Sequence, residues 1–427
     1  MAALLLTGAR LLDVVTGETA PGMSILIEGT RITRIVEGEI QARGATHIDV
    51  AGRTVMPGLI DAHVHAIAVA DSFPAIADLS PYLVGARALR VLSDMLSRGY
   101  TTVRDAGGAD AGLAAAVQEG PVYGPRLFPS GLALAQRHGQ GDFGRGSTAH
   151  PGCPVCHGRR TITRVVKGEV ELRAAVREEL DNGAAQIKLM ASGGILSGIP
   201  MEEPHFTRTE IAAAVTEAKA AGTYVMAHAY ESLAIDNCIA AGVRSIEHAT
   251  LLSPDTAKRI AAAGAGIVPT LTVFAVLRDS AEDQVTRARM SRLLQSGLES
   301  IDIARSAGVL TGHGTDLHHT AQHRQPEELL LRRPVMNNLE IIRAATLGNA
   351  TIMGIADKVG KIVEGMLADL IVLNGNPLAN IEVLCTPARN LACVIRGGVL
   401  CIDRIRHLPY ADVGTRHTPC EAQCRRL

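Results

Sequence analysis

The chain has 427 residues, and its 42 lysines and arginines nearly balance 43 aspartates and glutamates, giving a formal net charge of -1. Such a balance offers no overall electrostatic attraction to nucleic acid or to a membrane surface. Hydrophobic residues make up 47% of the chain and aromatic residues 3%, with no tryptophan. This composition predicts a globular protein with a substantial core and argues against an aromatic platform for stacking bases.

The sequence gives no sign of membrane insertion or export. No apolar run approaches the roughly 18–20 residues of a membrane-spanning helix, and the first ten residues lack the basic leader of an export signal. Eight cysteines are scattered along the chain without the framework of a small disulfide-rich protein. We therefore expect reduced thiols and a cytoplasmic location.

Both ends of the chain consist of short strand-like runs separated by glycine-rich turns. The same texture in residues 1–58 and 358–427 predicts that the two ends pair into one small β-sandwich domain. The middle, residues 59–357, instead alternates apolar strand runs with helical patterns, which is typical of parallel βαβ units.

The predicted strands of the middle segment are eight in number and cover residues 59–65, 101–105, 126–130, 186–191, 224–229, 245–249, 266–270 and 309–316. Helices are expected between most of them, at residues 84–97, 169–182, 209–221, 232–241 and 254–263. Eight such units favour an α/β fold of the (β/α)8 TIM-barrel type. A doubly wound sheet is the alternative.

The first of these strands ends in two histidines one residue apart, His63 and His65, after the turn Pro57-Gly58. Residues two apart on a strand point to the same face, so both imidazoles can be directed at one metal ion. Two solvated histidines at a strand end are the alternative interpretation.

Four further strands end in side chains that bind metals or carry protons. They are Lys188, His228, His248 and Asp316, in chain order. Catalytic groups of a barrel enzyme gather at the carboxyl ends of the strands, so all six side chains are predicted to meet at one mouth of the barrel. A lone strand-end histidine is often just a packed residue; the number and order of these six make a metal site the stronger interpretation.

The lead-in Pro57-Gly58-Leu59-Ile60-Asp61-Ala62 before the His-x-His pair, and the run Lys188-Leu189-Met190-Ala191-Ser192-Gly193-Gly194, resemble the amidohydrolase superfamily. The latter run is similar to its two-metal, carboxylated-lysine branch, which includes Xaa-Pro dipeptidases and ochratoxin amidohydrolases. The resemblance extends to Gly360–Leu370 near the end of the chain.

This resemblance implies two divalent metal ions, with zinc as the first choice for imidazole and carboxylate ligands. His63, His65 and Asp316 would hold the more buried ion, and His228 and His248 the more exposed one. Lys188 would take up carbon dioxide and bridge both ions as a carbamate. The alternative interpretation of Lys188 is a buried lysine paired with a carboxylate. A hydroxide bridging the metals would attack the substrate, and Asp316 would transfer the proton.

Two more side chains are candidates for contact with substrate. His138 lies in a glycine-containing loop that resembles the Gly-His-Gly loop of the same branch, where the histidine contacts the scissile carbonyl; Arg137 departs from that pattern. Tyr230 follows His228 by two residues and should face the same side. An exposed loop histidine and a packing tyrosine are the alternatives.

The resulting function prediction is metal-dependent hydrolysis of an amide C–N bond in an N-acyl amino acid or dipeptide. The alternatives are a hydrolase of a cyclic amide, urea or carbamate, and a non-catalytic metal-binding scaffold. The expected partner is a small-molecule amide or dipeptide, with no nucleic acid and no membrane, and the resemblance implies a homo-oligomer, octameric or dimeric. The few aromatic residues suggest a roomy, aliphatic acyl pocket. Cys153-Pro154-Val155-Cys156-His157 is open to three interpretations: a haem-attachment pattern, a zinc site or a substrate-gating loop.

Overall fold

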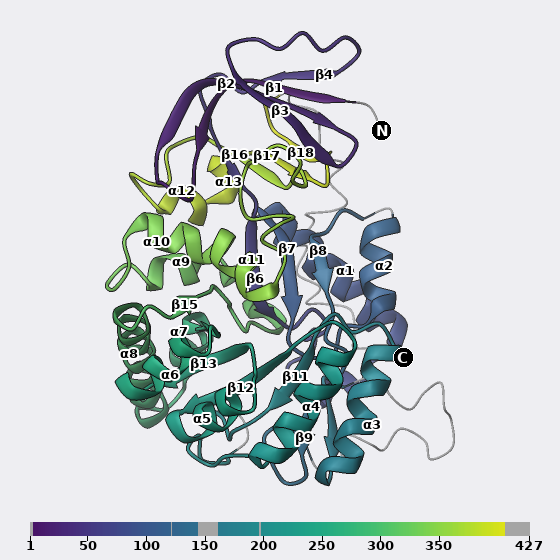
Figure 1. The fold of residues 1–427 in the computed structure, drawn as a ribbon, viewed down its shortest axis with the longest axis vertical. Helices are drawn as coiled ribbons and strands as arrows, with labels where there is room; N and C mark the ends of the chain where they lie inside the picture. Colours follow the sequence, from purple (N-terminus) through teal and green to yellow (C-terminus); the bar gives the residue numbers. More distant parts are fainter. Residues whose placement is uncertain (1–2, 121, 144–160, 196–197, 406–427) are drawn as a thin grey trace, which may run out of the picture.

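The computed structural model describes residues 3–120, 122–143, 161–195 and 198–405. The cysteine-bearing segment around Cys153 and the cysteines Cys420 and Cys424 lie outside the described residues. A small β domain occupies one end of the molecule, and a larger body of strands and helices follows it (Figure 1).

The β domain is built from both ends of the chain. Its eight strands share one sheet with the order β18-β17-β16-β5-β1-β2-β3, and β4 pairs with β1. The strands are β1 (Leu4–Leu12), β2 (Thr19–Glu28), β3 (Arg31–Glu37), β4 (Thr46–Asp49), β5 (Thr54–Pro57), β16 (Leu370–Leu373), β17 (Leu391–Arg396) and β18 (Val399–Asp403). The antiparallel pairing of β5 with β16 joins the two chain ends.

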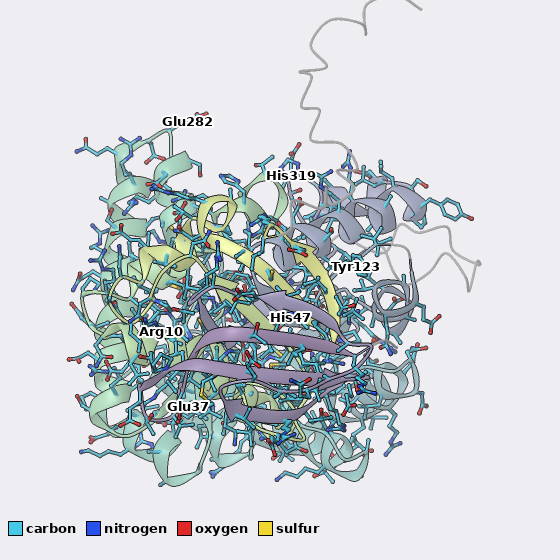
Figure 2. All side chains as sticks on the ribbon, turned by 90° about the horizontal axis from the view of Figure 1, so that it is seen from above. Arg10, Glu37, His47, Tyr123, Glu282 and His319 are labelled. Carbon is cyan, nitrogen blue, oxygen red and sulfur yellow. The ribbon has the colours of Figure 1, made fainter. Side chains whose placement is uncertain are left out.

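One surface of this sheet domain is polar. Seen from above, Arg10, Glu37 and His47 lie over the strands (Figure 2), and all three are exposed. Aliphatic side chains of the same strands, such as Leu6, Ile25 and Val372, are buried in a core of their own. The alternation of polar and apolar positions is what lets one strand serve both surfaces.

The larger body is an α/β barrel of the (β/α)8 type, as the sequence predicts, but its described residues form ten strands, because Ala133–Gln136 and Thr163–Val166 are strands that the sequence analysis did not predict. Its strands are β6 (Leu59–Val64), β7 (Tyr100–Asp105), β8 (Arg126–Phe128), β9 (Ala133–Gln136), β10 (Thr163–Val166), β11 (Ile187–Met190), β12 (Val225–Glu231), β13 (Ser245–Leu251), β14 (Gly266–Val268) and β15 (Leu310–Thr311). Neighbours from β11 to β15 pair in parallel, as do β6, β7 and β8. The N–H of Ala62 donates to the carbonyl of His313 at 2.9 Å, which links the last barrel segment back to the first strand.

Helices cover the outside of the barrel (Figure 1). They are α1 (Pro81–Ser97), α2 (Ala111–Glu119), α3 (Gly168–Asp181), α4 (Arg208–Ala220), α5 (Ser232–Ala240), α6 (Pro254–Ala262), α7 (Leu271–Ser280), α8 (Gln284–Ser306), α9 (Glu327–Leu331), α10 (Asn338–Arg343) and α11 (Asn349–Met353), with α12 (Glu382–Cys385) and α13 (Pro387–Asn390) beside the β domain. Short helical turns lie at η1 (Pro74–Asp78), η2 (His319–Arg324) and η3 (Ala344–Gly348).

Local sequence explains where several of these helices begin. The Thr207 hydroxyl accepts from the N–H of Glu210, and the Glu210 carboxylate accepts from the N–H of Thr207, forming a capping box that starts α4.

Among the described residues, no helix is both long and apolar enough to span a bilayer. The domain limits at 58/59 and 357/358 stay a prediction.

Candidate metal centre and active site

Four strands and one loop bring the six predicted ligands to one cavity. His63 and His65 come from β6 and the residue after it, Lys188 from β11, His228 from β12 and His248 from β13. Asp316 lies in the loop after β15. All six side chains line a single cavity, together with Tyr230.

The histidines of β6 and Asp316 form the tightest cluster. Ligand atoms of His63, His65 and Asp316 lie within 4.8 Å of one another. The Asp316 Oδ1 is 3.4 Å from Nε2 of His63 and 3.2 Å from Nε2 of His65. Within the part of the chain that the structure describes, the buried Nε2 of His63 has no hydrogen-bond partner. A buried nitrogen of this kind beside a carboxylate fits a metal ligand.

The remaining two histidines lie beside this cluster. The ring centroids of His63 and His248 are 4.9 Å apart, and those of His228 and His248 are 4.6 Å apart. Lys188 is 2% exposed, and its side chain reaches the same cavity. His228, His248 and Lys188 therefore lie around the same cavity as the His63–His65–Asp316 cluster.

Each imidazole uses one nitrogen for a contact with the protein and leaves the other for a ligand. In His63 and His65 the engaged atom is Nδ1, which is 2.7 Å from Oε2 of Glu247 and 3.2 Å from the carbonyl of Gly107, respectively. Contacts of this type fix the tautomer and the ring orientation of metal ligands.

The two outer histidines follow the same rule. Nδ1 of His248 is 2.7 Å from the Thr270 hydroxyl, and Nε2 of His228 is 3.1 Å from the carbonyl of Gly193. The free nitrogen is therefore Nε2 in His248 and Nδ1 in His228. The four rings are oriented before any ligand arrives.

Backbone strain marks two of these positions. His248 has φ 71° and Asp316 has φ 54°, in the left-handed region that side-chain-bearing residues rarely adopt. The N–H of Asp316 donates to the carbonyl of His63 at 2.9 Å. This bond holds the strained loop of Asp316 directly against β6.

Burial and neighbouring charges set the protonation of the cluster. Burial would raise the pKa of Asp316, but His63 and His65 hold that pKa well below its usual range. Burial lowers the pKa of Lys188 to about 8 and, together with the Lys188 charge, lowers the pKa of His228 to about 3. His228 and Asp316 therefore have the neutral and ionised forms that bind a divalent cation, whereas Asp316 raises the pKa of His65 although burial acts to lower it.

The structure adds a carboxylate that the sequence analysis did not single out. Glu247, on β13, is fully buried and joins His63 to the guanidinium of Arg104, whose Nη2 lies 2.8 Å from its Oε1. The Ser245 hydroxyl donates to the same oxygen at 2.6 Å. In the sequence, only the position of Glu247 beside His248 in a predicted strand could have indicated its role, because its partners Arg104 and His63 lie far away in the chain.

A second buried carboxylate supports the loop of Asp316. Asp61 accepts from the Thr315 hydroxyl at 2.6 Å and from the Gln325 side chain at 2.9 Å. It also accepts from the N–H of His63 at 3.1 Å. Asp61 thus connects the first ligand strand with the loop that carries Asp316.

Tyr230 and His138 have different positions. The Tyr230 ring stacks on His248 with a centroid distance of 4.9 Å and an interplanar angle of 8°, and it lines the cavity. His138 is exposed, has φ 62°, and its N–H donates to the Asp142 carboxylate at 2.7 Å. Gln140, Gly141 and Phe143 of this loop line the cavity, and His138 is not among the described lining residues. A contact of His138 with substrate stays a prediction.

The cavity that the six predicted ligands line is partly enclosed by apolar side chains. Its apolar wall includes Phe73, Phe143, Ile162 and Ile195. The chain has only five phenylalanines, so two of them at this cavity make it more aromatic than the composition suggests. Aromatic side chains therefore share the wall with the aliphatic ones that the sequence analysis expected.

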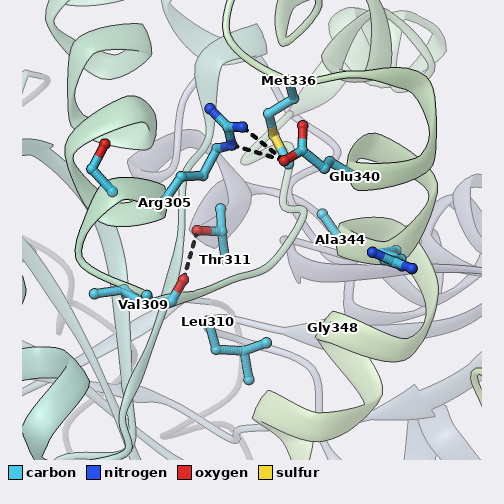
Figure 3. A pocket seen from close by; sticks show the side chains of 11 residues that line it. Arg305, Val309, Leu310, Thr311, Met336, Glu340, Ala344 and Gly348 are labelled. Atoms are coloured by element: carbon cyan, nitrogen blue, oxygen red, sulfur yellow. Dashed lines mark hydrogen bonds and ion pairs between the residues drawn. The ribbon is translucent and has the colours of Figure 1, made fainter. Parts of the chain in front are cut away.

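A second hollow lies at the opposite end of the barrel, where β15 begins (Figure 3). Its charged groups already have partners. Arg305 lies 2.7 Å from the Glu340 carboxylate, and Arg343 donates to the carbonyls of Val14 and Val15. None of the six predicted ligands lines this second hollow.

Comparison with known proteins identifies the family. Residues 54–401 match the amidohydrolase family. The chain belongs to the amidohydrolase family. It is a hydrolase that acts on carbon–nitrogen bonds of the amide type. This family generally uses a divalent metal centre, and the His63–His65–Asp316 cluster is present in this chain.

Individual relatives agree with this assignment. Ochratoxinase of Aspergillus niger is 30% identical over 371 residues, covering 81% of this chain and 75% of that protein. The structure of a prolidase complexed with N-methylphosphonate-L-proline is 41% identical, with a TM-score of 0.89, and covers 94% of this chain and 100% of that one. A Xaa-Pro dipeptidase with bound methionine in its active site is 29% identical, with a TM-score of 0.81, over 93% and 99% of the two chains.

Proposed function

We propose that this amidohydrolase cleaves the amide bond of an N-acyl amino acid or dipeptide, with two divalent metal ions held by the six ligands. The observation that carries the proposal is the convergence of His63, His65, Asp316, His228, His248 and Lys188 on one cavity. The similarity to a prolidase, a Xaa-Pro dipeptidase and an ochratoxinase supports the substrate class.

Zinc is the first choice of metal, since four imidazoles and a carboxylate are ligands that it prefers. When bound, the two ions would polarise the scissile carbonyl and supply hydroxide at neutral pH. The lowered pKa of Lys188 supports a carbamate: the neutral amine adds to carbon dioxide, forms an N–C bond and releases one proton.

Asp316 handles the proton in this proposal. Its carboxylate lies 3.4 Å from Nε2 of His63 and 3.2 Å from Nε2 of His65, at the cavity, where it can accept the proton of the attacking water. The same group then delivers this proton to the nitrogen of the leaving amine. Tyr230, stacked on His248 at the cavity wall, is placed to contact a substrate oxygen.

The apolar wall selects the acyl part of the substrate. Phe73 lies 6.1 Å from Phe143 between ring centroids, and both face the cavity with Ile162 and Ile195. Burying a large apolar group here removes its surface from water and favours binding. We therefore expect a bulky apolar or aromatic acyl group to be preferred over an acetyl group.

A substrate panel tests the proposal. The zinc-loaded protein is assayed with N-benzoyl-L-phenylalanine, N-acetyl-L-phenylalanine and alanyl-proline, and separately with hydantoin and a phenylurea. Turnover of the first group that disappears with a chelator and returns with zinc supports the proposal. Turnover of only the second group would favour the alternative of a cyclic-amide, urea or carbamate hydrolase, and no turnover at full metal occupancy would favour a binding scaffold.

A further inference from the structure

A buried carboxylate, that of Asp105, lies behind the proposed metal ligand His65. Asp105 is the last residue of β7 and is fully buried. It pairs in parallel with Val64 of β6, and the N–H of Ala106 donates to the carbonyl of Val64 at 2.8 Å. The end of β7 is therefore fixed beside the residue that precedes His65.

Both oxygens of the Asp105 carboxylate accept hydrogen bonds from backbone N–H groups. The N–H of Ala66, the residue after His65, donates to Oδ2 at 3.0 Å. The N–H groups of Gly107 and Ala109, in the loop after β7, donate to Oδ1 at 2.9 and 3.0 Å. One buried side chain therefore holds the backbone that follows β6 and the backbone that follows β7.

Gly107 connects this carboxylate to the ring of His65. Its N–H donates to Asp105, and its carbonyl oxygen lies 3.2 Å from Nδ1 of His65. A Cβ on Gly107 would lie 2.9 Å from the carbonyl oxygen of Ile162 and 3.5 Å from Cε1 of His65, so the absence of a side chain permits this close approach. Asp105 thus acts on His65 at two points, at the backbone through Ala66 and at the ring through Gly107.

The position of this ring matters because its other nitrogen faces the proposed metal site. Nε2 of His65 lies 3.2 Å from Oδ1 of Asp316. A zinc–imidazole bond is about 2.0–2.1 Å long, so a small displacement of the ring weakens it. Asp105 itself is not among the described residues that line the cavity, so any effect it has on a metal ion passes through His65.

We propose that Asp105 is a positioning residue for His65. Its carboxylate fixes the Gly107 carbonyl that receives Nδ1 and the Ala66 backbone beside the ring, so that Nε2 is directed at the metal. This inference rests on the metal centre of the proposed function and is independent of the substrate class.

Asp105→Asn tests the inference with little change of volume. Asparagine has one acceptor oxygen and one NH2 group, so the N–H of Ala66 or that of Gly107 must then face another donor. Zinc is titrated into the metal-free, full-length protein against a competing chelator. We expect the Kd of the tighter zinc ion to rise about 10-fold, the lower end of the range for groups that orient a ligand, because the Gly107 carbonyl remains. The visible absorption of the cobalt-loaded variant should also shift, since a displaced imidazole changes the ligand field.

A double-mutant cycle with His65→Ala separates positioning from a general effect on the fold. If Asp105 acts through His65, Asp105→Asn should change the zinc Kd of the His65→Ala protein by less than about twofold. Asp110→Asn is the matched control. Asp110 accepts from the N–H of Leu113 at 2.8 Å at the start of α2, and this substitution should leave the zinc Kd and the cobalt spectrum unchanged.

Asp105→Glu provides a second variant, because it keeps the charge and moves both oxygens by one methylene; we expect the same direction of change in the Kd. An equal rise in the Kd with and without His65 would overturn the inference. A lower urea midpoint together with wild-type zinc affinity and an unchanged cobalt spectrum would also overturn it, since Asp105 would then serve only the fold. Failure of the wild-type protein to bind zinc would instead overturn the proposed metal centre.

Discussion

Replacing Glu247 by glutamine should separate the stability of the barrel from its capacity to hold metal. The carboxylate is fully buried between Nδ1 of His63, at 2.7 Å, and Nη2 of Arg104, at 2.8 Å. Burial acts to raise the pKa of Glu247, but Arg104 and His63 lower this pKa to about 2. The wild-type side chain is therefore charged at neutral pH, and Glu247→Gln removes that charge without changing the volume.

Two losses are expected from this substitution. The guanidinium of Arg104 is fully buried and would lose its counter-charge, which costs about 3–5 kcal/mol in the free energy of unfolding. The His63 ring would lose its charged acceptor, and removal of such a contact typically lowers metal affinity about 10- to 100-fold. Urea unfolding measures the first loss, and zinc titration against a competing chelator measures the second.

A matched control lies elsewhere in the barrel. Glu328 and Arg332 form a second ion pair with both side chains fully buried, at 2.8 Å, and Glu328 accepts from Thr272. Glu328→Gln should therefore cost a similar unfolding free energy while leaving zinc affinity close to that of the wild type. If both variants bound zinc as the wild type does, Glu247 would have only a structural role and the reasoning about His63 would be refuted.

Three further substitutions test the residues around the metals. Asp316→Asn should retain a large part of the bound metal yet lose most turnover, because proton transfer to the leaving nitrogen fails; metal analysis beside kcat measures this, and full activity would refute the proposed role. Lys188→Ala should lose metal and recover part of it in the presence of acetate or another short carboxylate, whereas unchanged metal content would contradict the bridging carbamate. Tyr230→Phe should lower kcat/KM about tenfold with the fold and metal content intact, and an unchanged value would leave Tyr230 with a packing role against His248.

The barrel and the convergence of the six predicted ligands on one cavity could be predicted from the sequence, because both depend on local patterns. Runs such as Val225–Glu231 are apolar throughout most of their length, as a strand covered on both faces must be, and His228 near the end of this run is of a type that can bind metal. The predicted helix at residues 254–263 is observed as Pro254–Ala262 for the same reason, since Ser253 and Pro254 are helix-start residues.

Other features depend on contacts that no local pattern contains. The helices α7 and α8 fill the interval between the last two barrel strands, and their residues were not assigned from the sequence. Glu247 contacts Arg104 and His63 across 143 and 184 residues of chain. In the loop after β9, the left-handed backbone of His138 and Gly141 determines which side chain enters the cavity, and residue identity alone favours the histidine.

The junction between the two domains has a mechanical consequence. Gly58 separates β5, in the sheet made from both chain ends, from β6, which carries the metal-binding histidines. Its N–H donates to the carbonyl of Asp369 at 2.9 Å, and a Cβ at this position would lie 2.1 Å from Oγ1 of Thr101. The connection between β5 and β6 is therefore short and tightly packed. The sheet made from both chain ends supports the strand that carries His63, so we expect a change in that sheet to displace the imidazoles of His63 and His65.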